Sequence, residues 1–118
     1  MMEVQWVNTQ QVVVKLHGDF RVVVAATLRK KLLQLARKNP KTLVLNLSAV
    51  QAMDTAGIAV LVELYRMLVG RGGILSLVGL HDRLRKMVQL THLDQLLNLC
   101  NSVEAALAKD QENQVGCS

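Results

Sequence analysis

The sequence has little aromatic character and no long apolar run. Its 118 residues include one Trp, one Tyr and one Phe, so the core must be built from aliphatic side chains and methionine. The longest apolar runs, Val22–Ala26 and Ile58–Val62, fall far short of the ~20 residues that a membrane span needs. The first ten residues also lack the basic and then apolar layout of a signal peptide. We therefore expect a soluble, cytoplasmic protein.

Cysteine and histidine are too few and too scattered to indicate a metal site or a structural disulfide. Cys117 lies in a polar tail far from the fold's apolar segments, so we expect it to form no disulfide with Cys100. His17, His81 and His92 show neither of the H-x-x-H and H-x-x-x-H spacings that metal sites on helices use. We expect no metal and no cofactor.

Basic residues exceed acidic ones, 14 against 9, which gives a formal charge of +5. Much of the basic charge falls in residues 28–41 and 81–87, and we interpret both segments as solvated helix faces. Attraction to an acidic protein or to anionic lipid heads is the alternative. Nucleic acid is the least favoured partner, because almost no aromatic side chain stands among the basic residues to stack on bases. We expect no direct contact with nucleic acid and no membrane insertion.

The pattern of apolar residues predicts strands that alternate with helices. Residues 3–7 and 11–16 indicate a hairpin around a turn at 8–10. The short apolar runs at 42–47 and 74–79 are typical of strands that are covered on both faces. Helical periodicity marks residues 22–38, 54–68, 80–90 and 102–109. The order β-β-α-β-α-β-α-α predicts one α/β domain over residues 1–109 with a mixed sheet, followed by a flexible tail at 110–118.

One junction, residues 48–58, carries most of the functional information. The strand at 42–47 ends there, a short loop crosses, and Asp54 or Thr55 is well suited to cap the next helix. In that helix we expect the inward face to be formed by Ile58, Leu61, Val62, Tyr65 and Leu68 or Val69. The loop lies at the carboxyl end of the sheet, where open α/β folds place their sites, and a helix N-terminus there favours negative charge. No histidine stands nearby as a base for a nucleophile, so a hydrolase is not favoured.

The same junction resembles the signature of STAS domains, the fold of bacterial anti-sigma factor antagonists. The matching residues are Asn46-Leu47-Ser48, Val50 and the run Met53–Ile58. The similarity continues through "GGILSLVG" (72–79), "LRKMVQLTHLDQLL" (84–97) and "SVEAAL" (102–107), and covers about residues 10–108. It implies a mixed sheet of four to five strands with about four helices packed mainly on one face.

The resemblance also implies a switch on a binding surface and no enzyme activity. In the antagonists, a hydroxyl residue between the Asp and the Gly is phosphorylated by a GHKL-type serine kinase that is itself the anti-sigma factor. The unphosphorylated antagonist binds this kinase and frees the sigma factor. Carried over by position, the candidates are Thr55 and Ala56, of which only Thr55 has a hydroxyl. The implied partner-binding residues are Asp54, Thr55, Ala56, Gly57 and Ile58.

Two departures remove negative charge near this loop. Arg21 stands where the antagonists usually have an Asp, and Asn46 replaces the Asp at the strand end. Arg21 is therefore a candidate to bind the partner, to pair with Asp54, or to pair with a bound anion. The sequence Asp54-Thr55-Ala56-Gly57 also resembles small STAS subunits of phospholipid-transport ABC systems, which dock on the ATPase subunit. We favour the regulatory antagonist, with exposed side chains such as Glu63 and Arg66 facing the partner or solvent.

Overall fold

The structure is a computed structural model that describes residues 2–19, 22–92 and 97–114. Within these ranges the chain forms five strands and four helices. They follow in the order β1 (Met2–Trp6), β2 (Gln11–His17), α1 (Val22–Ala36), β3 (Thr42–Ala49), α2 (Thr55–Gly70), β4 (Ile74–Val78), α3 (Asp82–Leu90), β5 (Asn98–Cys100) and α4 (Val103–Gln114).

The five strands form one mixed sheet in the order β1-β2-β3-β4-β5. β1 and β2 are an antiparallel hairpin, and all the other neighbours are parallel. The hairpin turn is closed by Asn8, whose Oδ1 accepts hydrogen bonds from the backbone N–H groups of Gln10 and Gln11 at 2.8 and 2.9 Å. The predicted hairpin and the predicted α/β class are therefore confirmed.

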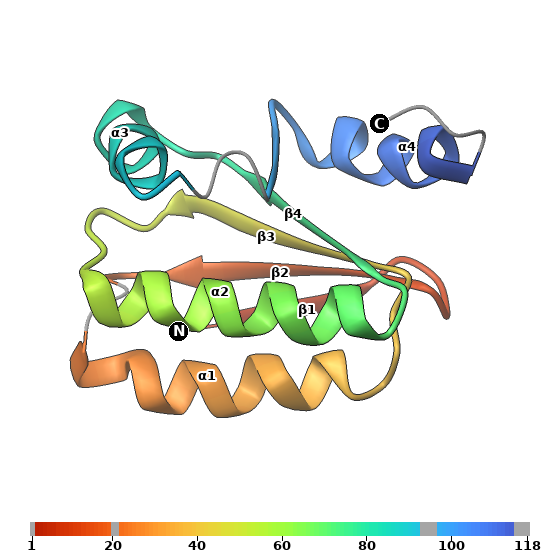
Figure 1. Cartoon of the computed structure of the whole chain (residues 1–118), viewed down its shortest axis with the longest axis horizontal. Coiled ribbons are helices and arrows are strands. Elements are labelled where there is room, and N and C mark those ends of the chain that lie inside the picture. Colours follow the sequence, from red (N-terminus) through yellow and green to blue (C-terminus); the bar gives the residue numbers. More distant parts are fainter. Residues whose placement is uncertain (1, 20–21, 93–96, 115–118) are drawn as a thin grey trace.

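The main core lies on the sheet face that α1 and α2 cover. Figure 1 shows these two helices side by side below the strands, and they contact one another directly. The face beneath them is made of buried aliphatic side chains at alternating positions. These are Val12, Val14, Leu16, Leu43, Leu45, Leu47, Leu75 and Leu77. Leu84 and Val88 of α3 join the same core, so three of the four helices bury residues there.

The opposite face of the sheet is covered by α4. Ala106 of α4 packs against Val44 and Val78 in a second, smaller cluster. The helix contacts β3, β4 and β5, and Figure 1 shows it on the other side of the strands from α1 and α2. Because β3 lies between two layers of helices, its apolar run is almost continuous, as expected for a doubly covered strand.

The structure differs from the sequence-based expectations in four places. The three-residue strand β5 was not expected as an element, and α1 ends at Ala36, two residues early, where Asn39 adopts a left-handed backbone (φ 57°) before Pro40. α4 runs to Gln114, past the residue where we expected the tail to begin. The expected inward face of α2 left out Leu64, which is fully buried, and of its alternatives Leu68 or Val69 it is Leu68 that is buried.

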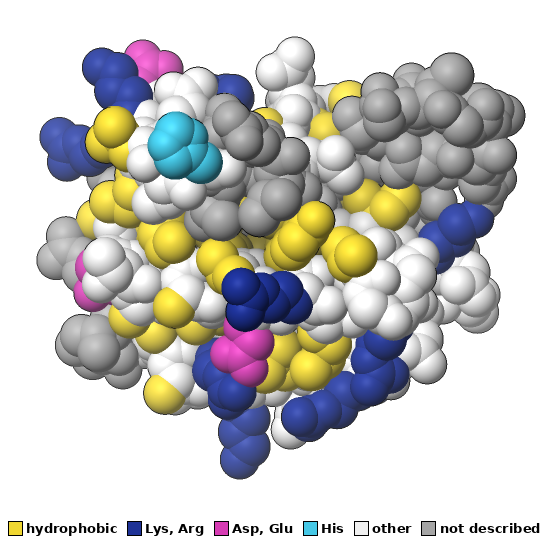
Figure 2. Space-filling model, viewed as in Figure 1, with side chains coloured by type: hydrophobic (Ala, Val, Ile, Leu, Met, Phe, Trp, Pro, Cys, Tyr) yellow, Lys and Arg dark blue, Asp and Glu magenta, His cyan; other side chains and the backbone are white. Residues whose placement is uncertain are grey.

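The basic side chains of residues 29–38 face solvent, as interpreted from the sequence, partly on α1 and partly in the turn after it. Arg29, Lys30, Lys31, Arg37 and Lys38 are all exposed. Figure 2 shows Lys and Arg side chains along the lower edge of the molecule, over this helix. In the described ranges no helix is long and apolar enough to cross a membrane, and no three His, Cys, Asp or Glu side chains gather as metal ligands.

Candidate partner-binding site

The site begins where β3 leaves the sheet and ends in the first turn of α2. Two apolar side chains anchor the connecting loop in the core, since Val50 is 1% exposed and Met53 4% exposed. The backbone N–H of Val50 also donates to the carbonyl oxygen of Leu47 at 3.0 Å. With both ends held in this way, the loop presents the start of α2 in one orientation.

Asp54 is the N-cap of α2, one of the two residues that the sequence proposed for this role. Its backbone is extended, and its Oδ1 accepts hydrogen bonds from the N–H groups of Ala56 at 3.0 Å and Gly57 at 3.2 Å. Its carbonyl oxygen accepts from the N–H of Ile58 at 3.1 Å. Asp54 therefore satisfies three backbone donors in the first turn and places a carboxylate at the positive end of the helix dipole.

The residues after the cap differ in their exposure. Thr55 is exposed, Ala56 and Ile58 are half-buried, and Gly57 is buried. Of the expected contact residues in this run, Thr55 is the one with a reactive oxygen at the surface. Arg21, the remaining candidate, lies outside the described residues.

His81, just before α3, supports the same loop, and no sequence pattern had indicated this role. Its Nε2 lies 3.1 Å from the carbonyl oxygen of Gln51, which can only accept, so Nε2 carries the proton. Its Nδ1 accepts from the backbone N–H of Leu84 at 3.5 Å and so caps α3. One imidazole thus connects the loop before Asp54 with the first turn of α3.

Gly79 provides a second support, at the end of β4. Its φ of 78° is left-handed, and a Cβ at this position would lie 2.7 Å from the backbone nitrogen of Ser48. That nitrogen donates to Oδ1 of Asn46 at 3.0 Å. The position therefore suits glycine both by its backbone angle and by its close contact with the end of β3.

An ion pair joins α1 and α2 beside the site. Arg29 donates from Nε to Oε1 of Glu63 at 2.7 Å and from Nη2 to Oε2 at 2.5 Å. These hydrogen bonds and the positive charge of the guanidinium lower the pKa of Glu63, against a smaller opposing effect of desolvation. A shallow groove of about 380 Å³, lined largely by alanines such as Ala56 and Ala59, lies next to the pair. Glu63 is therefore paired within the chain and only partly exposed, whereas Arg66, the other side chain expected at this surface, is exposed.

The family of the chain follows from this fold and from direct comparison. The sequence pattern of the STAS domain matches residues 3–106, which include the whole sheet apart from Met2 and the junction at Asp54 as well. The chain belongs to the STAS domain family.

Similar proteins point to the regulatory branch of STAS domains. The anti-sigma-B factor antagonist of Bacillus subtilis is 30% identical over 100 residues, which are 85% of this chain and 91% of that protein. This likeness places the STAS domain described here among the anti-sigma factor antagonists, which are regulatory proteins.

Solved structures agree with the fold. A proposed anti-sigma factor antagonist from Thermotoga maritima has a TM-score of 0.88 at 19% identity and covers 93% of this chain and 94% of its own. The phosphorylated form of SpoIIAA, a cell fate determinant of Bacillus, has a TM-score of 0.72 at 20% identity, with 92% of this chain and 98% of its own covered. The expected STAS fold is confirmed.

Proposed function

We propose that this STAS domain binds an anti-sigma factor that is also a GHKL-type serine kinase. The contact surface is the segment Asp54–Ile58, with Arg21 as a further contact. The observation that carries the proposal is that Thr55, which has a hydroxyl, is exposed directly after the N-cap of α2. The chain contributes a binding surface to this partnership and no catalytic group. The partnership places it in the cytoplasm, where sigma factors act.

Phosphorylation of Thr55 would switch this surface off. A phosphate adds about −1.5 to −2 charges and three acceptor oxygens at neutral pH. At Thr55 it would stand next to the carboxylate of Asp54, within the interface, so a partner surface that fits the neutral hydroxyl would meet repulsion and a cost of desolvation. The helix N-terminus would tolerate the new charge, because the dipole of α2 favours anions there. The domain would therefore stay folded while its affinity falls.

Thr55 is the only residue of the motif that can serve as this switch. The neighbouring position is Ala56, which has no hydroxyl and is half-buried. SpoIIAA has been solved in both unphosphorylated and phosphorylated forms, which supports the view that this fold accommodates the modification. A kinase that accepts only the residue next to the glycine would leave this chain permanently active.

The test is an affinity capture from an extract of the source cells, with three tagged proteins in parallel. Native protein, Thr55→Glu and Thr9→Glu are compared by mass spectrometry. Thr9 is exposed in the β1–β2 turn, near the end of the sheet where β3 begins, so it controls for the added charge. We expect a GHKL-type kinase with native protein and with Thr9→Glu, but not with Thr55→Glu. Equal capture by all three would remove Thr55 from the interface.

The lipid-transport alternative has one residue in its favour. With Ala56, the motif Asp54-Thr55-Ala56-Gly57 has a single hydroxyl, and in this form it resembles the STAS subunits of phospholipid-transport ABC systems. Capture of an ABC ATPase together with its permease would support this alternative and contradict the antagonist proposal. A Thr55→Val variant also distinguishes the two proposals. In the antagonist it should abolish phosphate incorporation by the kinase. In a transport subunit it would remove only one hydroxyl from the docking surface.

A further inference from the structure

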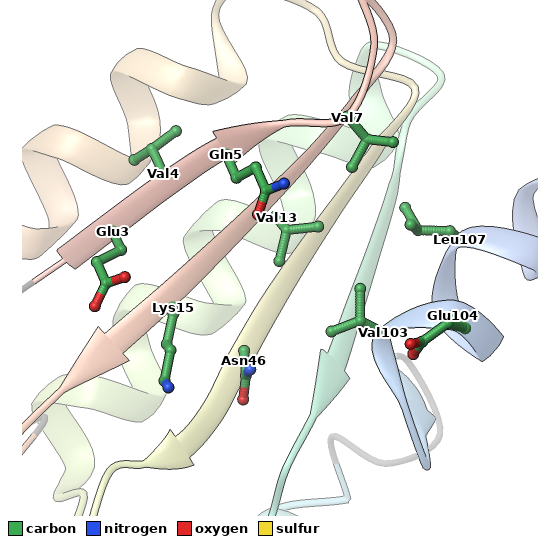
Figure 3. Close-up of a pocket in the computed structure, with 10 residues that line it drawn as sticks. All are labelled: Glu3, Val4, Gln5, Val7, Val13, Lys15, Asn46, Val103, Glu104 and Leu107. Carbon is green, nitrogen blue, oxygen red and sulfur yellow. The ribbon is translucent and has the colours of Figure 1, made fainter.

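A groove remains open on the sheet face opposite α1 and α2. α4 packs mainly on β3, β4 and β5 and meets β2 near its start, at Gln11, whereas most of β1 is exposed. The resulting hollow, which we call the sheet groove, has a volume of about 600 Å³. Figure 3 shows side chains of β1, β2 and β3 along its floor and three residues of α4 along its wall. The volume is in the range of small-molecule sites in proteins.

One part of the sheet groove offers unused hydrogen-bond donors. Lys15 and Asn46 are direct neighbours across the parallel β2–β3 ladder, and both are half-buried. Oδ1 of Asn46 accepts from the N–H of Ser48, so its Nδ2 group remains as a donor. Among the described residues, Lys15 has no hydrogen-bond or ion-pair partner. The carboxylate of Glu3, opposite Lys15 on β1, contacts the ring of His17 instead.

The remaining lining is mainly apolar. Val13 lies on the floor, and Val103 and Leu107 project from α4 (Figure 3). All three are half-buried and pack against the small cluster around Val44. The position of α4 is held by Gln11, whose Nε2 donates to the carbonyl oxygen of Leu107 at 3.3 Å. The sheet groove is therefore amphipathic, with an ammonium and an amide in one part and aliphatic side chains in another.

Acidic side chains limit the charge that such a site accepts. Glu104 lines the sheet groove from the first turn of α4, and Glu3 lines it from β1. A ligand with one negative charge can be neutralised by Lys15, but a second charge would face these carboxylates. Phosphate esters and dicarboxylates are disfavoured for this reason. A carboxylate with an aliphatic tail suits both the donors and the apolar wall.

We propose that the sheet groove binds a small monocarboxylate with an aliphatic tail. The carboxylate meets the ammonium of Lys15 and the amide of Asn46, and the tail lies along Val13, Val103 and Leu107. The site lies on the other face of the sheet from α1 and α2. It does not depend on the proposed role of Thr55.

Hexanoate is the probe, titrated into ¹⁵N-labelled protein and followed by the amide shifts of two-dimensional NMR. Hexylamine carries the same tail with the opposite charge, and adipate carries a second carboxylate. We expect saturable shifts with hexanoate at Val13, Lys15, Asn46 and Leu107. The other two compounds should bind about tenfold more weakly or not at all.

Two methionine variants test the role of the charge. Lys15→Met removes the ammonium but keeps much of the side-chain length, and Lys30→Met makes the same change on the exposed face of α1. Loss of a charge-assisted hydrogen bond should weaken hexanoate binding by roughly tenfold or more in Lys15→Met and leave Lys30→Met like the native protein. Unchanged affinity in Lys15→Met, shifts confined to the face of α1 and α2, or no saturation by hexanoate would each overturn the proposal.

Discussion

Gly72 and Gly79 have nearly the same backbone conformation, and comparing alanine variants of the two measures how much the close contact of Gly79 with Ser48 matters. Gly72 and Gly79 have φ angles of 80° and 78°. A Cβ on Gly72 would meet no atom within 4 Å. On Gly79 it would lie 2.7 Å from the nitrogen of Ser48, 2.8 Å from the Cβ of Ser48 and 2.9 Å from Oδ1 of Asn46. Alanine should therefore cost the same backbone strain at both positions, but a steric clash is expected only at position 79.

The magnitudes follow from these distances. A left-handed backbone costs a residue with a Cβ about 1–2 kcal/mol, which is the whole expected loss for Gly72→Ala. Gly79→Ala adds overpacking against the backbone of Ser48, typically about 1–3 kcal/mol. We expect Gly79→Ala to lower the free energy of unfolding by about 2–5 kcal/mol in total, well beyond the loss in Gly72→Ala.

Equilibrium unfolding in urea, followed by far-UV circular dichroism, measures both losses. The comparison is valid if the slope of free energy against denaturant is unchanged. Because Ser48 precedes the loop that leads to Asp54, Gly79→Ala should also weaken partner binding, while Gly72→Ala should not. Equal destabilisation by the two variants would show that the end of β3 moves to accommodate the added Cβ without a loss of stability. The close contact at Gly79 would then not support the site.

Three other perturbations test the cap, the core and the surface pair. Asp54→Ala should lower the free energy of unfolding by about 1–2 kcal/mol in urea titrations, and Asp54→Asn by much less, because Asn retains the cap. Within the described residues the hydroxyl oxygens of Thr42 and Ser76 are buried without a hydrogen-bond partner. Thr42→Val should therefore raise the melting temperature, and the free energy of unfolding should increase by roughly 1 kcal/mol. A decrease would indicate that the hydroxyl has a partner. The pKa of Glu63 is lowered by Arg29, so their coupling in a double-mutant cycle should be present above about pH 4.5 and disappear as the pH falls below the folded pKa.

The order of the main elements could be predicted because its signals are local. Alternation marked β2, and glycines marked the end of α2 before β4. The helix cap could be narrowed to Asp54 or Thr55, because a capping side chain reaches only two or three residues along the chain. The three-residue strand β5 was missed because it has almost no pattern of its own. Its strand geometry comes from pairing with β4, which brings Leu77 beside Leu99.

The inward face of α2 shows what the spacing of apolar residues can and cannot predict. The sequence predicted a wide apolar stripe, and the stripe exists, but Leu64 lies at its centre and Val69 outside it. On a helix that is apolar over much of its circumference, the packing of α1 and the sheet decides which residues are buried. The same packing brings Arg29 to Glu63 across 34 positions of sequence, which no local pattern reports.

The sequence by itself predicted a helix that starts at Asp54 or Thr55 after a central strand, and the residues around this start resemble the STAS signature. Only the tertiary structure decided what surrounds that motif. His81 and Gly79 reach the loop because β4 ends beside β3, and Lys15 and Asn46 share a groove because β2 and β3 pair in register. Capping depends on neighbours along the chain, whereas these contacts join residues about 30 positions apart and exist only once the sheet has formed.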